Sequence, residues 1–230
     1  MIVKPSGDLR ICVDYRRVNE QTVKDSHPLP NITATLDELA GARWFSSFDL
    51  VSVYYQIEVL PEDQEITAFA SPYGLFQYRR MPFGLSNAPS TFQRVIDDLT
   101  QVLNMEDLVT YLDDIICFHK TFPEYLAGIR RVLEMCRNAG LKLAPHKCQL
   151  ARKEISVLGH VVNREGLKPQ QQKVDVIANY WPQPNSKDEL SRFLGLCGYY
   201  RRFIPSFADI TSSLFDAVKE DFQWTLGTPE

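Results

Sequence analysis

The sequence lacks the features that mark secreted, membrane-spanning and disulfide-linked proteins. No apolar run approaches the roughly 20 residues that a membrane-spanning helix needs, and the first residues, Met1-Ile2-Val3-Lys4-Pro5, lack the apolar core of a secretory signal. The five cysteines are an odd number, are widely spaced and include no Cys-x-x-Cys pair. We therefore expect reduced thiols in an intracellular protein that does not contact a membrane.

The sequence also lacks the excess of basic residues that is typical of nucleic-acid-binding proteins. Its formal net charge is −4, with 25 Lys and Arg against 29 Asp and Glu. A groove lined by small basic clusters would still bind phosphates, although an ordinary solvated surface is an equally good interpretation of any one cluster. These clusters are Arg16-Arg17, Arg79-Arg80, Arg130-Arg131, His146-Lys147, Arg152-Lys153 and Arg201-Arg202.

What the 230 residues do contain is enough apolar sequence, 44%, for one large or two small domains. Residues 108–118 place two adjacent carboxylates, Asp113 and Asp114, in the middle of an apolar run of β-forming residues. The simplest local structure is a hairpin with both acids at its tip. Neighbouring anions in an apolar setting are costly unless a divalent metal ion offsets their charge. A solvated turn is the alternative interpretation.

A third acid, Asp49, ends another aromatic, strand-like run at residues 44–50 and argues against the solvated turn. Three carboxylates from two strand elements would hold two Mg²⁺ ions ~3.5–4 Å apart, the arrangement that carries in-line phosphoryl transfer. The acids therefore predict a two-metal site.

Six blocks of the sequence resemble, in order, motifs of reverse transcriptases. Tyr111-Leu112-Asp113-Asp114 is similar to the Tyr-x-Asp-Asp box, and Phe48-Asp49-Leu50 with Tyr54-Tyr55-Gln56-Ile57 looks like the first catalytic-Asp motif. The block from Met81 to Gln93 is similar to the intervening motif as gypsy-type LTR retrotransposons spell it. Residues 13–19, 157–162 and 193–204 also match, so the resemblance covers nearly the whole chain.

The resemblance implies an RNA-directed DNA polymerase that adds dNTPs to a primer 3′-OH by a two-metal mechanism. The catalytic residues would be Asp49, Asp113 and Asp114, and the metal ligands would be these acids with Leu50. The cofactor would be two Mg²⁺ ions, with Mn²⁺ as an alternative. The partners would be an RNA or DNA template with its primer and dNTPs.

The resemblance also assigns binding residues. Those for the nucleotide are Lys4, Arg10, Tyr54, Phe83 and Gly84. Those for template and primer are Asp14, Arg16, Asn19, Pro89, Gln93, Tyr111, Leu112, Leu158 and Gly159. Arg10 as an exposed strand residue and Tyr54 as a core aromatic remain alternatives, and His160 is expected to be an ordinary half-exposed strand histidine. Val53 stands where the family usually has Gly or Ala, which would place extra methyl groups beside the nucleotide sugar.

The expected fold is an α+β right-hand polymerase, in which an antiparallel sheet with packing helices forms the palm. Fingers are expected at 1–23 and 57–87, the palm at 24–56 and 88–164, and a helical thumb with the start of the connection region at 165–230. The patterns predict hairpins within 1–23 and 61–80, helices at 31–42, 89–103 and 123–138, and β structure at 145–162. Later helices would begin at Pro169, Ser186 and Pro205.

The sequence carries no ribonuclease H carboxylate cluster and no Asp-Ser/Thr-Gly protease signature, so we expect a piece of a Pol polyprotein in a cytoplasmic particle or the nucleus. It would act as a homodimer or in association with the rest of the polyprotein. Two other functions stay open: a catalytically silent fragment that binds template–primer or serves as a non-catalytic subunit, and a metal-dependent nuclease.

Overall fold

The structure, a computed structural model, describes residues 2–3, 7, 9–10, 12–28, 30–179, 184 and 186–219. The chain forms two compact units, Met1–Ile155 and Ser156–Glu230. The first unit therefore holds the expected fingers together with most of the expected palm. The second unit begins earlier than the expected thumb boundary at 164/165, so the hairpin around Gly159 belongs with the C-terminal helices.

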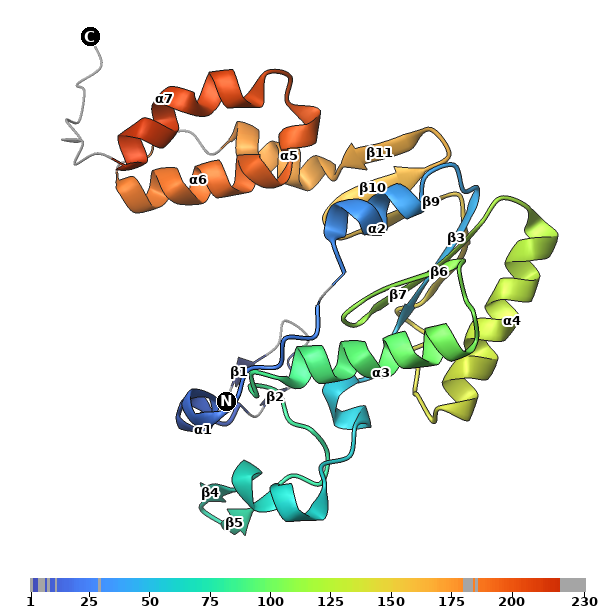
Figure 1. The fold of residues 1–230 in the computed structure, drawn as a ribbon, viewed down its shortest axis with the longest axis vertical. Coiled ribbons are helices and arrows are strands. Elements are labelled where there is room, and N and C mark those ends of the chain that lie inside the picture. The colour runs from blue at the N-terminus through green and yellow to red at the C-terminus, as the bar shows by residue number, and fades with distance from the viewer. Residues whose placement is uncertain are drawn as a thin grey trace. The chain divides into compact units, whose positions relative to one another are not determined.

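A four-stranded antiparallel sheet forms the centre of the first unit (Figure 1). Its order is β6 (Leu108–Tyr111), β7 (Asp114–His119), β3 (Trp44–Asp49) and β8 (Gln149–Arg152). β6 and β7 are joined by a turn at Leu112 and Asp113, so the predicted acidic hairpin is confirmed. The predicted strand that ends at Asp49 is confirmed as well, and it pairs with β7 along its whole length.

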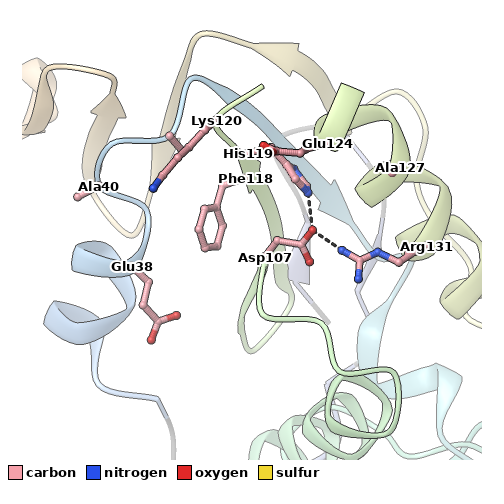
Figure 2. Close-up of a pocket in the computed structure, with 10 residues that line it drawn as sticks. Glu38, Ala40, Asp107, Phe118, His119, Lys120, Glu124, Ala127 and Arg131 are labelled. Carbon is pink, nitrogen blue, oxygen red and sulfur yellow. Dashed lines mark hydrogen bonds and ion pairs between the residues drawn. The ribbon is translucent and has the colours of Figure 1, made fainter. Parts of the chain in front are cut away.

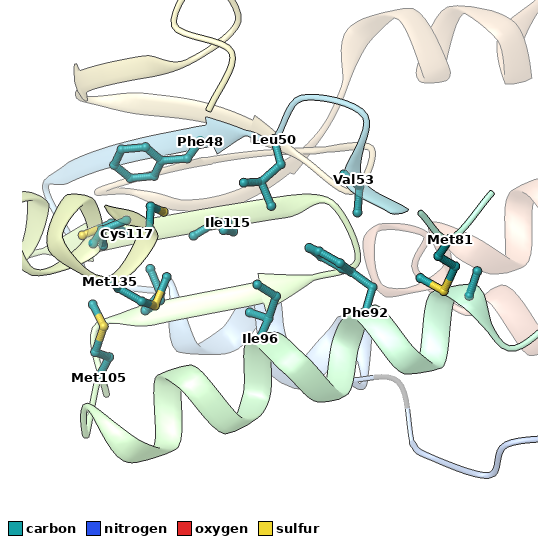
Figure 3. Packing of buried hydrophobic residues seen from close by; sticks show 14 residues of the cluster. Phe48, Leu50, Val53, Met81, Phe92, Ile96, Met105, Ile115, Cys117 and Met135 are labelled. Carbon is teal, nitrogen blue, oxygen red and sulfur yellow. The ribbon is translucent and has the colours of Figure 1, made fainter. Parts of the chain in front are cut away.

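Two helices, α3 (Ala88–Val102) and α4 (Phe122–Asn138), pack against this sheet. Pro89 lies in the first turn of α3, where its missing N–H costs nothing, and Thr121 with Glu124 forms a capping box at the start of α4. Figure 3 shows side chains of α3 meeting those of the sheet in one apolar cluster. Its members from these elements include Phe48, Ile115, Cys117, Phe92, Ile96, Val132 and Met135.

The inward face of α4 differs in part from the predicted one. Val132 and Cys136 are buried as expected, but Leu126 and Leu133 are 54% and 42% exposed. Tyr125 and Met135 take the inward positions instead. The polar hydroxyl of Tyr125 is accommodated because it lies 3.1 Å from Ser46 Oγ of β3 and accepts a hydrogen bond from the Ala151 amide at 2.8 Å.

Shorter elements complete the first unit. The predicted hairpins are confirmed but shorter than expected, as β1 (Ile2–Val3) with β2 (Leu9–Arg10) and β4 (Phe69–Ser71) with β5 (Gly74–Phe76). Asn31 caps α2 (Ile32–Glu38) by accepting from two backbone amides, as predicted. Three elements were not predicted: α1 (Arg16–Gln21) and two 3₁₀ helices, η1 (Val53–Gln56) and η2 (Pro61–Thr67).

The second unit combines a small sheet with helices. Its strands are ordered β11 (Gly166–Pro169), β10 (His160–Asn163) and β9 (Glu154–Val157), the last of which begins in the first unit. The predicted helices are confirmed as α5 (Gln171–Ala178), α6 (Lys187–Tyr199) and α7 (Phe207–Lys219), with a 3₁₀ turn η3 (Arg201–Phe203). β11 was not predicted, since the helical pattern was expected to start at residue 165. No helix among the described residues is long and apolar enough to span a bilayer.

A polar network holds the end of the β6–β7 hairpin that lies opposite its acidic turn. Asp107, just before β6, pairs through Oδ2 with both His119 Nε2 of β7 and the guanidinium of Arg131 on α4, as Figure 2 shows. Among the described residues, the other oxygen, Asp107 Oδ1, is buried without a hydrogen-bond partner. A cavity of about 520 Å³ lies beside this network, lined also by Phe118 and Lys120. The network joins α4 to both strands of the hairpin.

Gly128 on α4 is the position that makes room for this network. A Cβ at Gly128 would lie 2.2 Å from His119 Cε1, and the ring is buried and held by Asp107. Gly128→Ala should therefore lower the free energy of unfolding by about 1–3 kcal/mol, although Ala is the better helix former. In a His119→Ala background the clash with the ring is removed and only Asp107 Oδ2, at 3.2 Å, remains close to the new Cβ. The same substitution should then cost much less, or raise the free energy of unfolding by up to about 1 kcal/mol. Urea denaturation of the unaltered chain, the two single variants and the double variant measures the effect of Gly128→Ala in both backgrounds. Equal effects in the two backgrounds would contradict a clash between Gly128→Ala and His119.

Candidate active site

The strand register gathers the predicted acids on one face of the sheet. Asp49 and Asp114 are direct cross-strand partners, and Asp113 stands next to Asp114 in the turn. Side chains alternate along a strand, so Asp49 and Asp114 point away from the face that Phe48 and Ile115 present to the helical core. Solvent reaches the acids there, and the Asp49 side chain is 38% exposed. The three predicted catalytic acids are therefore together on the open face of the sheet, where the central strand β3 ends and its neighbour β7 begins.

The turn that carries Asp113 is held by α3. Leu112 adopts a left-handed backbone with φ of +54°, a conformation that a leucine rarely takes. Gln93 Oε1 of α3 accepts a hydrogen bond from the Leu112 amide at 2.8 Å, and Gln93 Nε2 donates to Asp97 Oδ1 at 2.8 Å and Thr110 Oγ1 at 3.2 Å. The expectation that Gln93 faces the template is corrected, because the side chain is fully buried and its amide group binds the backbone of the turn at Leu112.

Lys147, which the sequence indicated only as part of a basic cluster, pairs with the first acid. Lys147 Nζ lies 3.1 Å and 3.4 Å from the two carboxylate oxygens of Asp49. Its loop is fixed to β3, since the Ala144 amide donates to the Asp49 carbonyl at 2.8 Å and the Lys147 amide donates to the Ala144 carbonyl at 2.9 Å. Lys147 thus supplies a positive charge within the acidic group.

The electrostatics show that the acids are close enough to repel one another. Burial raises the pKa of Asp114, and the charges of Asp113 and Asp49 raise it further. Among the described residues, no group of three or more His, Cys, Asp or Glu side chains is arranged so that it would hold a metal ion. The donors are nonetheless carboxylate oxygens, the ligands that Mg²⁺ prefers, and the excess of negative charge at Asp114 is what a cation would relieve. The residues therefore fit a divalent ion by their chemistry.

The expected nucleotide residues gather beside the acids where the structure describes them. Tyr54 of η1 packs on Phe83 with ring centroids 5.0 Å apart, and both burial and the charge of Asp113 raise the pKa of Tyr54. Val53 is only 6% exposed and belongs to the apolar cluster, so its methyl groups fill core volume (Figure 3). Lys4 and the side chain of Arg10 lie outside the described residues.

At Gly84 the backbone comes close to the side chain of Tyr15. A Cβ at this position would lie 3.3 Å from the ring of Tyr15, and the Gly84 carbonyl accepts a hydrogen bond from Asn19 Nδ2 at 2.8 Å. Asn19 Oδ1 also accepts from the Ser86 amide at 2.8 Å. Gly84 and Asn19, expected to contact nucleotide and template, thus connect helix α1 to the loop before α3.

The remaining expected template and primer residues fall into both units. In the first, the guanidinium of Arg16 pairs with Asp14 at 2.6 Å, and both side chains are exposed. Tyr111 ends β6 beside the acidic turn and Pro89 begins α3. Leu158 and Gly159 form the β9–β10 turn of the second unit.

Comparison with known proteins assigns this arrangement to a family. Residues 2–162, most of the chain, match the family described as reverse transcriptase (RNA-dependent DNA polymerase). The chain belongs to the reverse transcriptase family. The resemblance read from the six sequence blocks is thereby confirmed, and reverse transcriptases generally use divalent metal ions.

Relatives of this reverse transcriptase chain are retrotransposon polyproteins. It is 41% identical over 211 residues to the retrovirus-related Pol polyprotein from transposon 297 of Drosophila melanogaster, covering 92% of this chain and 20% of the relative. It is 33% identical over 223 residues to the transposon Tf2-3 polyprotein of Schizosaccharomyces pombe, covering 97% and 17%. The chain therefore spans about a fifth of the length of these curated relatives.

Solved structures confirm the predicted α+β polymerase fold. A foamy viral protease-reverse transcriptase in complex with double-stranded DNA has a TM-score of 0.87 at 28% identity, covering 95% of this chain and 38% of that chain. A foamy viral protease-reverse transcriptase in complex with an RNA/DNA hybrid has a TM-score of 0.81 at 27% identity, covering 97% and 30%.

The support of the acidic turn by Gln93 can be tested by stability. Gln93→Leu keeps a side chain of similar volume but leaves the Leu112 amide and Asp97 Oδ1 without the Gln93 amide. Asp97 Oδ2 keeps its contact with His27. The free energy of unfolding in urea should fall by about 1–3 kcal/mol, the usual cost of stranded buried polar groups. Gln101→Leu, at an exposed position of the same helix, is the matched control and should change it by less than about 0.5 kcal/mol. A loss no larger than the control's would show that Gln93 does not hold the turn.

The repulsion among the acids predicts that neutralising one of them stabilises the metal-free protein. Because the folded-state pKa of Asp114 is raised, the stability that this acid contributes is present below its unfolded pKa and lost as the pH rises through the folded value. Asp114→Asn should therefore raise the melting temperature at pH 7 in chelator, with a gain that shrinks as the pH is lowered toward 4. Asp98→Asn, exposed on α3, should show no such gain. A lower melting temperature for Asp114→Asn at pH 7 would contradict the crowding of charges.

Proposed function

We propose that this chain is the polymerase portion of a reverse transcriptase, which adds dNTPs to a primer 3′-OH on an RNA or DNA template. The observation that carries the proposal is the cross-strand pair Asp49–Asp114, with Asp113 beside it, on the open face of the sheet. Both polymerase structures above were solved with nucleic acid, double-stranded DNA in one and an RNA/DNA hybrid in the other. We further propose that the chain works as part of a Pol polyprotein, as its relatives are such polyproteins.

The acids are the proposed ligands of two Mg²⁺ ions, with Leu50 contributing beside Asp49. When bound, such ions lower the pKa of the attacking hydroxyl and neutralise charge on the phosphates. The protein's own part is positioning. Gln93 holds the backbone beside Asp113, strand pairing fixes Asp49 opposite Asp114, and Lys147 keeps the Asp49 carboxylate oriented.

The nucleotide would lie against Tyr54 and Phe83. Packing between these rings limits how far Tyr54 can move, so its position beneath the sugar would disfavour a 2′-OH and thereby select deoxynucleotides. Arg10, with Lys4, would contact the triphosphate, for which a guanidinium offers paired donors and a permanent charge. Gly84 would complete the nucleotide site.

Template and primer would contact two groups of residues. In the first unit these are Asp14, Arg16, Asn19, Pro89, Tyr111 and Leu112, and in the second unit they are Leu158 and Gly159, which would press on the primer terminus. We assign residues 1–23 and 57–87 to fingers, 24–56 and 88–164 to palm and 165–230 to thumb. Dimer formation is a further proposal that size-exclusion chromatography with light scattering would test.

Primer extension on an RNA template tests the function directly. Asp113→Asn should reduce dNTP incorporation about 100-fold or more, because it removes one charge from the metal site with little change in shape. Asp98→Asn should retain the incorporation of the unaltered protein. Binding of template–primer without extension by the unaltered chain would favour the silent fragment, and cleavage of the nucleic acid would favour the nuclease.

A further inference from the structure

The turn between β9 and β10 has a backbone that needs external support. Leu158 has a φ of +46° and Gly159 a φ of +74°, so two consecutive residues are left-handed. For glycine this is an ordinary conformation, but for a leucine it costs about 1–2 kcal/mol. A strained residue persists only where its surroundings hold it in place.

Two tyrosines from the end of α6 bind the carbonyls of this turn. Tyr199 Oη donates a hydrogen bond to the Leu158 carbonyl at 2.6 Å, and Tyr200 Oη donates to the Gly159 carbonyl at 2.9 Å. They lie 41 residues from their acceptors in the sequence, so the contacts tie α6 to the turn. A Cβ at Gly159 would lie 2.7 Å from Tyr200 Oη, which explains why this approach requires glycine.

His160 supplies a third contact from within β10. Its Nδ1 lies 2.8 Å from the Leu158 carbonyl, so the protonated nitrogen donates to the same oxygen as Tyr199. His160 is 2% exposed, and its ring centroid lies 5.2–5.7 Å from the ring centroids of Tyr199, Tyr200 and Phe203. Burial lowers the pKa of His160, which favours the neutral ring. The expected half-exposed histidine is thus corrected to a buried one.

The two carbonyls of the turn differ in the kind of groups that donate hydrogen bonds to them. Besides Tyr200, the Gly159 carbonyl also accepts from the Gln170 amide at 3.2 Å, so it keeps a partner if Tyr200 is altered. The Leu158 carbonyl depends on two side chains, Tyr199 and His160. The strained residue is therefore the one held by side chains, and the aromatic cluster keeps those side chains in place.

We infer that Tyr199, Tyr200 and His160 are positioning residues that lock the Leu158–Gly159 turn to helix α6. This inference rests on the proposed function, in which that turn presses on the primer terminus. A displacement of about 1 Å from the reactive geometry is enough to reduce a rate about 100-fold. The lock therefore acts on the rate of nucleotide addition through the turn, without touching the reacting atoms.

Hydrogen exchange of the full chain tests the lock without relying on polymerase activity. In Tyr199→Phe/Tyr200→Phe both rings remain and only two hydroxyls are lost. Amide exchange in peptides covering residues 156–163 should become about 10-fold faster, with peptides of α3 and α4 unchanged. Tyr73→Phe, at an exposed turn of the first unit, is the control and should leave both regions unchanged. Unchanged exchange at 156–163 in the double variant overturns the inference, whether or not the protein polymerises.

Steady-state primer extension tests the consequence. The double variant should lose about 10-fold in kcat, while the KM for dNTP and the Kd for template–primer stay within about 2-fold. His160→Asn, which keeps a donor near the place of Nδ1, should retain more kcat than His160→Leu. Unchanged kcat despite faster exchange, or a loss confined to Kd, overturns the positioning role. Absence of extension by the unaltered chain would refute the proposed function, and the exchange result would still decide the lock.

Discussion

The pairing of β3 with β7 is the constraint on which the rest of the active site depends. It places Asp49 directly opposite Asp114, so the fold brings like charges together that would separate if free. The repulsion between these charges is offset by burial of apolar side chains on the other face of the same strands, where Phe48, Ile115 and Cys117 lie in the apolar cluster. A slip of one residue would turn these apolar side chains outward, so core packing fixes the register and the register fixes the acids.

The helices that cover the sheet act at both ends of the β6–β7 hairpin. At the acidic turn, Gln93 of α3 holds the Leu112 amide, and at the opposite end Arg131 of α4 pairs with Asp107. Between these two polar contacts the helices bury apolar side chains against the strands. Polar contacts at the ends and apolar packing in the middle leave the hairpin little freedom to tilt, and a site that must position charges benefits from such rigidity.

The sequence predicted what local pattern controls and missed what depends on contacts distant in the chain. The acidic hairpin, the strand ending at Asp49 and the main helices followed from periodicity and capping residues. The sequence placed Lys147 in a basic cluster but did not indicate its pairing with Asp49, because the two residues lie 98 positions apart. The burial of Gln93 and the exposure of Leu126 were equally hidden, since each depends on which neighbours the fold supplies. The helix α1, the 3₁₀ helices η1 and η2 and the strand β11 were missed because short elements have weak patterns.

The two units share one device that no sequence pattern reveals. In each, a leucine sits in the left-handed region at a hairpin turn, Leu112 in the first and Leu158 in the second. In each, a side chain from a helix binds the backbone of that leucine: Gln93 accepts from its amide in one case, and Tyr199 donates to its carbonyl in the other. A strained turn held by a helix has one stable geometry, whereas a relaxed glycine turn would have several. Leu112 and Leu158, both proposed to contact template or primer, thus lie in turns whose shape is set by helix side chains.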